Sequence, residues 1–358
     1  MDFALSPDQR MMQASIAGVL DRVAPLARVR SFAEGDEPVA RDVWAALAEL
    51  GLPGLLVTEE YGGLGLGLLE AAIAAEAIGA RAAPSPFLGA AILAPLAIAA
   101  AGLPAQRQAW LPKLSASEIG AGVVLHEALA PARDAAGIIA EGGRLSGESL
   151  FAIDALGADI LIVADRDGGL HLAPASEAEI TPLPTIDATR RFAGVRFDRA
   201  PAEPLPGNEA LDRLRDAAFV ILAADMLGAS QTMLDTAASY AEERRQFGRP
   251  IGSFQAVKHM CAEMAAELEP CRALVWYAAY AFDAAPAEAP LVAAHAKAHL
   301  AEVSRFVART ATEVHGGIGF TDLLGLHYWF KRVGVDRQLF GGPEQIRDHA
   351  ARLQGLMA

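Results

Sequence analysis

The 358-residue chain has only two cysteines, Cys261 and Cys271, and only eight histidines. The cysteines lack the paired spacing of a zinc site and are too few for a disulfide framework. The histidines have no metal-ligand spacing either. We therefore expect no metal site. We also expect a reducing, cytoplasmic setting in which both cysteines are small core residues.

Cations are scarce as well, because 30 Lys and Arg residues stand against 44 Asp and Glu residues, for a formal net charge of −14. A strongly acidic chain repels nucleic acid and anionic membrane surfaces, so we expect neither as a partner. A phosphate-bearing ligand would have to bind through a few cations placed close together.

Signals that would direct the chain to a membrane are missing. The N-terminal residues contain no basic region followed by an apolar run, so we expect no signal peptide. Residues 86–104 carry no charge, but they are rich in Ala and Gly, and Pro95 interrupts them. Their transfer into lipid is therefore unfavourable, and we expect a buried helix rather than a membrane span.

Apolar residues are abundant, at 53% of the chain, and their pattern changes twice along it. Residues 1–115 have helical periodicity and predict an N-terminal α-helical domain. The first helix is expected after Ser6, because Ser6-Pro7-Asp8-Gln9 has the form of a capping box with proline at the first helical position. Further helices are predicted over residues 40–50, 67–80, 88–101 and 105–112.

Residues 116–205 contain short β-rich runs separated by turn residues, which predicts a middle antiparallel β domain. Residues 206–358 are helical again, and helices as long as these usually pack as a bundle. We therefore expect a C-terminal four-helix bundle and an α+β, mainly α fold. The long apolar-periodic segments are residues 209–243, 255–282 and 288–315.

The long helices also predict an oligomer. Their apolar residues are too many to be buried within one chain of this size, so we expect a dimer or tetramer with contacts supplied by the bundle.

Two motifs lie in the last third of the chain. The first is E-R-R-Q-F-G-R-P-I over residues 243–251, followed by F-Q-A-V-K over residues 254–258. The second is E-V-H-G-G-I-G-F-T over residues 313–321. In order and separation they resemble the R-x-Q-F-G-x-P-I…Q and Q-x-x-G-G-x-G-[FY] signatures of the acyl-CoA dehydrogenase family. Segments 52–63 and 109–112 also resemble that family, so the resemblance covers nearly the whole chain.

The chemistry of the two motifs suits a flavin dinucleotide. The guanidinium of Arg244 can grip a pyrophosphate bidentately. The amide of Gln246 can bond ribityl or phosphate oxygens, and Phe247 offers a stacking face to adenine. The adjacent glycines Gly316 and Gly317 allow a backbone to approach a diphosphate closely.

The resemblance implies FAD as the cofactor, bound mainly by the neighbouring subunit and contacted by these five residues together with Gln255. It also assigns Glu313 to this site, where the family usually has glutamine. The Glu313 carboxylate would set a negative charge near the pyrophosphate. The implied partners are an acyl-CoA substrate and an electron-transfer flavoprotein or similar electron acceptor.

The catalytic centre departs from the family pattern. In the family, a glutamate in a Y-E-G-[TS] segment removes the α proton of the thioester while a hydride passes from the β carbon to the flavin. Here Gly341 has that position, and Ala218 has about the second position at which the family can carry a base. Glu344 should point elsewhere. Asp225, a lone carboxylate in an apolar helical stretch, is a candidate for a displaced base, although a buried carboxylate with a structural partner is the commoner case.

The middle domain has diverged from the family as well. Residues 125–134 read L-H-E-A-L-A-P-A-R-D, where the family has the T-E-P-x-x-G-S-D loop that holds the flavin and the acyl-CoA. The [WF]-I-T segment over the isoalloxazine becomes Phe151-Ala152-Ile153, which loses the threonine donor. Positions that serve a subunit's own flavin have decayed, whereas most of those that serve a neighbour's flavin remain.

This pattern resembles the base-lacking subunit of the heterotetrameric acyl-CoA dehydrogenases that some bacteria use on sterol side chains. We therefore expect a FAD-dependent oxidoreductase subunit of fatty acid or sterol degradation that completes the FAD site of a second acyl-CoA dehydrogenase subunit. Two alternatives stay open. One is a homo-oligomeric dehydrogenase with Asp225 as an atypical base, and the other is a flavin-free scaffold that binds acyl-CoA.

Overall fold

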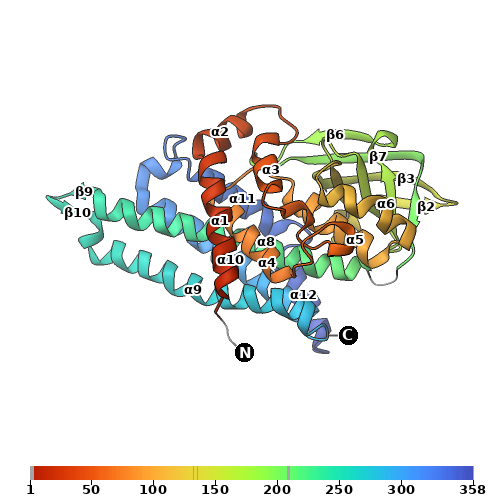
Figure 1. Cartoon of the computed structure of the whole chain (residues 1–358). Coiled ribbons are helices and arrows are strands. Elements are labelled where there is room, and N and C mark those ends of the chain that lie inside the picture. Colours follow the sequence, from red (N-terminus) through yellow and green to blue (C-terminus); the bar gives the residue numbers. More distant parts are fainter. Residues whose placement is uncertain (1–3, 132, 135, 208–209, 358) are drawn as a thin grey trace.

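The computed structural model describes residues 4–131, 133–134, 136–207 and 210–357. Its elements form three consecutive groups, with helices up to Ser115, mainly strands between Ala121 and Leu205, and mainly helices from Ala210 onward (Figure 1). This order confirms the expected α+β, mainly α fold class. The limits 1–115, 116–205 and 206–358 stay predictions, because buried residues of all three groups share one continuous hydrophobic core.

The first helix, α1 (Pro7–Val23), begins at the predicted capping box. The Ser6 hydroxyl accepts from the Gln9 backbone N–H at 3.1 Å, and the Gln9 side chain accepts from the Ser6 N–H at 2.8 Å. The helix α2 was not predicted, because it has only nine residues between Pro25 and Gly35. The other N-terminal helices are α2 (Leu26–Glu34), α3 (Arg41–Ala48), α4 (Leu68–Ala80) and α6 (Pro104–Ser115), with 3₁₀ turns η1 (Leu52–Gly54) and η2 (Glu59–Tyr61).

The uncharged stretch 86–104 is a buried helix, as predicted. It starts as a π-helix, η3 (Phe87–Leu93), and continues as α5 (Ala94–Ala101). The wide π turns lie directly before Pro95, which has no N–H to donate to the helix. The carboxylate of Asp154 accepts from the Gly89 N–H at 2.7 Å and fixes the start of this helix to the strands.

Among the described residues, eight strands form one sheet in the order β6-β7-β3-β1-β4-β5-β8, with β2 also paired to β3. Side chains alternate between its faces, so Val123 and Ile162 join the core shared with the helices, whereas Val124 and Val163 join a second, smaller core. The strands are β1 (Ala121–Val124), β2 (Gly137–Glu141), β3 (Arg144–Ile153), β4 (Ile160–Ala164), β5 (Leu170–Pro174), β6 (Glu179–Leu183), β7 (Phe192–Pro201) and β8 (Glu203–Leu205), with the short helix α7 (His126–Leu129) after β1 and a 3₁₀ turn η4 (Ala175–Glu177).

The sheet is mixed rather than purely antiparallel, so the prediction was wrong for one pair. Strands β1 and β4 run parallel, with Ala121 opposite Ile160 and Val124 opposite Val163. Parallel neighbours need a long connection that returns the chain to its starting edge. Here that connection contains α7 and the β2–β3 hairpin.

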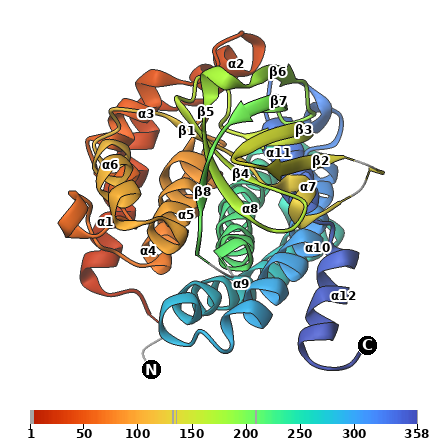
Figure 2. The same ribbon diagram turned by 90° about the vertical axis from the view of Figure 1, so that its right-hand side faces the viewer.

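The C-terminal group contains the three long predicted helices, which Figure 2 shows below and behind the strands. One of them, α8, is long and apolar enough to cross a membrane by length and composition alone, but 83% of its most apolar window is buried inside the protein. It is therefore a core helix. The elements are α8 (Ala210–Glu243), β9 (Arg245–Gln246), β10 (Arg249–Pro250), η5 (Ile251–Ser253), α9 (Gln255–Ala284), α10 (Ala289–His315), η6 (Gly316–Phe320), α11 (His327–Gln338) and α12 (Pro343–Leu353).

One arginine fastens α2 to the sheet. Arg191, at the start of β7, donates to the backbone carbonyls of Phe32 at 2.7 Å, Gly35 at 2.8 Å and Glu37 at 2.9 Å. Its guanidinium also lies 4.1 Å from the centre of the Phe32 ring. Carbonyls at the end of a helix have no intrahelical donor, so a cation is favourable there.

Helices α4 and α8 touch through two glycines. A Cβ atom on Gly79 would lie 2.1 Å from the Asp225 carbonyl oxygen, and one on Gly228 would lie 1.9 Å from the Glu76 carbonyl oxygen. Neither glycine has a positive φ, so close backbone approach, and not conformational freedom, requires glycine here.

We predict that Gly228→Ala lowers the free energy of unfolding by about 3 kcal/mol, at the upper end of overpacking effects, because α4 and α8 must separate. Gly18→Ala is the matched control, since Gly18 lies in α1 with nothing within 4 Å of an added Cβ. Gly18→Ala should raise the free energy of unfolding by about 0.5–1 kcal/mol. Denaturant unfolding measures both, and equal stability of the two variants would contradict the close crossing.

Candidate functional site

The two C-terminal motifs lie at the same end of the helical bundle. The rings of Tyr240, near the end of α8, and His315, the last residue of α10, stack with centroids 4.7 Å apart and an interplanar angle of 29°. Arg244 follows Tyr240 by one helical turn, and its N–H donates to the Tyr240 carbonyl at 2.8 Å. Gly316 follows His315 directly. Arg244 and the glycine pair are thereby brought together, although 72 positions separate them in the sequence.

The β9–β10 hairpin projects from this end, at the far left of Figure 1. Its two-residue turn is Phe247-Gly248, and both residues have positive φ, 52° and 79°, as a type I′ turn requires. Phe247 is 91% exposed, yet its ring packs edge-on against Phe254 at 6.0 Å, and the Arg249 guanidinium lies 4.0 Å from the Phe254 ring. The hairpin therefore displays an aromatic ring to solvent in a fixed orientation.

The side chains predicted to hold a dinucleotide are accessible. Arg244, Gln246 and Gln255 are exposed, and within the described ranges the Arg244 guanidinium has no hydrogen bond or ion pair. Gly316 has φ of 62°, and an added Cβ on either glycine of the pair would meet nothing within 4 Å. Glu313, on the last turn of α10, is exposed too. The whole predicted set lies at this end of the bundle.

Gly341, the residue at which the resemblance predicts the family's glutamate position, lies inside the protein. Phe340 and Gly341 are both buried and have positive φ, 59° and 113°. The Phe340 N–H donates to Nδ1 of His126 at 3.3 Å. The His126 ring lies 5.1 Å from the Phe151 ring and 6.0 Å from the Phe340 ring. We call His126, Phe151 and Phe340 the aromatic plug.

The imidazole in the plug is held neutral. A backbone N–H can only donate, so Nδ1 of His126 accepts and the proton of the ring is on Nε2. Burial lowers the pKa of His126. The ring can therefore offer a proton from Nε2 but has no free lone pair with which to take one.

The loop after β1 is closed by an ion pair. The Arg133 guanidinium donates from Nε to the buried carboxylate of Glu127 at 2.7 Å and lies 3.8 Å from Glu148 on β3. Arg133 is therefore paired with two carboxylates of the strand group and is not available to bind a phosphate.

Asp225, the candidate for a displaced base, is bound bidentately to Arg332 of α11. Nε of Arg332 donates to Oδ1 at 2.7 Å and Nη2 donates to Oδ2 at 2.6 Å. Burial raises the pKa of Asp225, but the charge and hydrogen bonds of Arg332 outweigh burial and hold it below its ordinary value. The cavity beside Asp225 has a volume of about 20 Å³. That volume holds one water molecule and no acyl chain.

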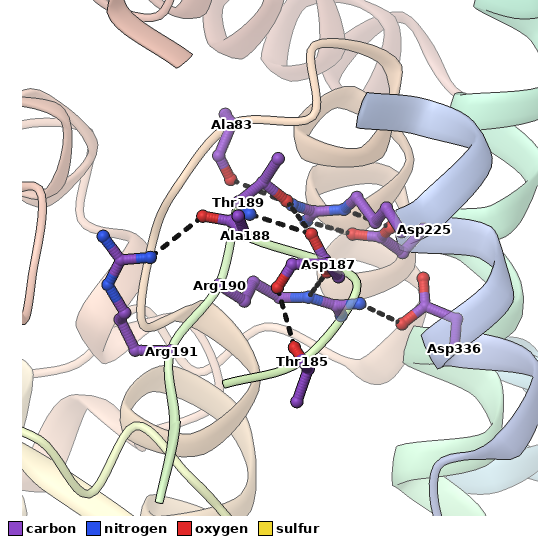
Figure 3. Close-up of polar contacts among 10 residues, drawn as sticks. Ala83, Thr185, Asp187, Ala188, Thr189, Arg190, Arg191, Asp225 and Asp336 are labelled. Carbon is purple, nitrogen blue, oxygen red and sulfur yellow. Dashed lines mark hydrogen bonds and ion pairs between the residues drawn. The ribbon is translucent and has the colours of Figure 1, made fainter. Parts of the chain in front are cut away.

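Asp225 is one member of a buried ionic cluster (Figure 3). Arg190 donates from Nε to Asp187 at 2.9 Å, and its Nη2 lies 2.6 Å from Oδ1 of Asp336. The third nitrogen of Arg332, Nη1, reaches the Thr189 hydroxyl at 2.9 Å. Burial raises the pKa of Asp336 above its ordinary value, although Arg190 opposes the shift.

No local sequence pattern indicates these partners of Asp225. Arg332 and Asp336 are spaced by four on α11 and share a face with Tyr328, which hints that this face turns inward. The residues near Asp225 in the sequence do not indicate that Arg332 is its partner. Among the described residues, no group of three or more His, Cys, Asp or Glu side chains is arranged to hold a metal ion.

Comparisons with known proteins cover most of the chain. Residues 6–118 match the family model "Acyl-CoA dehydrogenase, N-terminal domain", and residues 212–353 match "Acyl-CoA dehydrogenase, C-terminal domain". The chain is 33% identical over 343 residues to "Acyl-CoA dehydrogenase IpdE2" of Mycobacterium tuberculosis, which covers 95% of each protein.

Two solved structures have the same fold. The "Tcur3481-Tcur3483 steroid ACAD G363A variant" is 29% identical, with a TM-score of 0.88 over 98% of both chains. The "ChsE4-ChsE5 complex from Mycobacterium tuberculosis" is 24% identical, with a TM-score of 0.92 over 100% of both chains. The chain therefore belongs to the acyl-CoA dehydrogenase family, whose cofactor is FAD.

Proposed function

We propose that this chain is the base-lacking subunit of a mixed acyl-CoA dehydrogenase, in which it completes the FAD site of a second, base-bearing subunit. The observation that carries the proposal is a contrast between two places in the fold. The end of the bundle that carries the two motifs has exposed glycines and an arginine, Arg244, whose side chain has no partner among the described residues. At the position of the family's glutamate stands Gly341, which is buried and directly follows Phe340 of the aromatic plug.

The exposed end fits the diphosphate half of FAD. Three arginines, Arg244, Arg245 and Arg249, lie within six residues and are exposed, in a chain whose formal net charge is −14. They are the local cations that a phosphate-bearing ligand needs. Arg244 and Gln246 would hold pyrophosphate and ribityl oxygens, Phe247 would stack on adenine, and the glycine pair would admit the diphosphate to the backbone. Bound FAD supplies the acceptor for the substrate hydride.

The region where the family's catalytic centre is expected in this chain suits neither an isoalloxazine ring nor proton removal from a substrate. The resemblance puts residues 125–134 and 151–153 around the flavin ring, and here they carry the Glu127–Arg133 pair and two rings of the plug. Gly341 has no side chain that could take a proton, and Nδ1 of His126 already accepts the Phe340 N–H. The α proton of an acyl-CoA would therefore have to be removed by the partner subunit.

The relatives support a mixed assembly and a steroid-type substrate. Two of the structures that share this fold carry the names of two proteins, Tcur3481-Tcur3483 and ChsE4-ChsE5, and the first is named a steroid ACAD. We extend both features to this chain. It would act in a dimer or tetramer on a sterol or fatty acyl-CoA, pass electrons to an electron-transfer flavoprotein or similar acceptor, and work in the cytoplasm.

The first prediction concerns the isolated chain. Purified alone, it should not bleach flavin absorbance when acyl-CoA is added, since a positioned base contributes about 10²–10⁴-fold to the rate. Expressed with a tag in its native host, it should copurify with an acyl-CoA dehydrogenase chain that has glutamate at the position of Gly341, and that complex should bleach. Rapid bleaching by the isolated chain would reject the proposal.

The second prediction concerns FAD binding by that complex. Arg244→Ala removes a charged hydrogen bond worth about 1.5–3 kcal/mol, which corresponds to FAD held about 10- to 150-fold more weakly. The complex should still assemble, because the side chain is exposed. Arg22→Ala, an exposed arginine on α1, and Phe151→Leu, in the plug, are the controls and should retain FAD on gel filtration. Loss of FAD from Phe151→Leu but not from Arg244→Ala would mean that the chain holds its own flavin.

The third prediction concerns the missing base. Gly341→Glu should not make the isolated chain active, because the plug remains and φ of 113° disfavours any side chain. The strained backbone should cost about 1–3 kcal/mol of unfolding free energy. Gly18→Glu adds the same charge on α1 without strain and should leave the melting temperature nearly unchanged. Acyl-CoA-dependent flavin reduction by Gly341→Glu would show instead that only the base was lacking.

The fourth prediction separates Asp225 from catalysis. Asp225→Asn leaves Arg332 buried without its counter-charge, which should cost about 3–5 kcal/mol of unfolding free energy. Because the pKa of Asp225 is lowered in the folded chain, its ion pair stabilises at neutral pH, and that stability is lost as the pH falls below the ordinary carboxyl range. The surface carboxylate Asp212, paired with Arg215, is the control, and Asp212→Asn should cost at most about 1 kcal/mol. If the isolated chain did bleach flavin, loss of that bleaching in an Asp225→Asn chain of normal stability would support the displaced-base alternative.

A further inference from the structure

The exposed FAD half-site is assembled from two segments that are not covalent neighbours. Arg244 directly follows α8, and Gly316 and Gly317 directly follow α10. The hold on a diphosphate depends on the distance between them, because a displacement of about 1 Å is enough to weaken a charged contact of this kind. Some interaction must therefore fix one helix end against the other.

The Tyr240–His315 stack has the geometry to do this. It joins the last turns of the two helices, one turn before Arg244 and one residue before Gly316. His315 is 97% buried, as its exposed fraction is 3%, and Tyr240 is half-buried. Any sliding of α8 along α10 at this end would separate the two rings.

The His315 ring is itself held in one orientation. Its Nδ1 lies 2.7 Å from the Ala311 carbonyl oxygen, one turn back on α10. A carbonyl can only accept, so Nδ1 carries a proton and donates it to Ala311. Nε2 is buried and has no hydrogen-bond partner among the described residues. Within the part of the chain that the structure describes, the contacts of this ring are therefore its stack on Tyr240 and its Nδ1 bond to Ala311.

We propose that Tyr240 and His315 are positioning residues for FAD, which act by holding Arg244 and the Gly316–Gly317 turn at the spacing the dinucleotide needs. This inference rests on the proposed function of that end of the bundle. Neither ring has to touch FAD. Their contribution passes through the backbone, from Tyr240 to Arg244 along α8 and from His315 to Gly316 along α10.

The test measures the affinity of the flavin-stripped complex for FAD. His315→Leu and Tyr240→Leu should each bind FAD about 3- to 10-fold more weakly, the range of an aromatic pair, while the complex still assembles. His315→Phe and Tyr240→Phe keep two facing rings and should restore affinity to within about 2-fold of the original. Failure of both Phe variants to restore affinity would overturn the role of the stack.

A double-mutant cycle supplies the decisive readout. If the stack acts through Arg244, then His315→Leu should cost almost nothing once Arg244→Ala is present, whereas a general loss of folding would weaken both backgrounds equally. Additive effects would overturn the inference. An unchanged FAD affinity in Arg244→Ala would instead reject the proposed function, so the two failures are distinguishable.

Discussion

The whole fold depends on the buried pair of Asp225 and Arg332. An isolated charge in a protein interior is very costly, so each of these residues needs the other in place. Arg332 also reaches the Ala83 carbonyl and the Thr189 hydroxyl, so one guanidinium bonds to α8, to the segment after α4 and to the connection before β7. The Arg332 guanidinium therefore connects the helical groups to the strand group, because each group supplies only some of its hydrogen-bond acceptors.

Phe151, Phe340 and Gly341 all have positive φ and lie in or beside one cluster of rings. Such conformations persist only where the surroundings enforce them. Here the surroundings are the packed rings of His126, Phe151 and Phe340, which hold the segment around Gly341 in place.

Local patterns predicted the helices well, because apolar periodicity over 30 residues and a capping box at Ser6 are signals contained within a segment. They failed for the parallel pairing of β1 with β4, because a β-rich run does not show the direction of its neighbour. Motifs predicted the residues of the exposed half-site by resemblance. The partners of Asp225 and His126 are separated from them by 107 and 214 positions, and nothing local specifies such contacts.

The attachment of α2 by Arg191 affects which substitutions the end of this helix can tolerate. Each bond from the guanidinium to the helix end is made to a main-chain oxygen, which every amino acid provides equally. A substitution at position 35 or 37 can therefore leave the Arg191 bonds in place, although replacing Glu37 would remove its ion pair with Arg28 of α2. The bonds that Arg191 makes to the end of α2 therefore do not depend on which side chains stand at those positions.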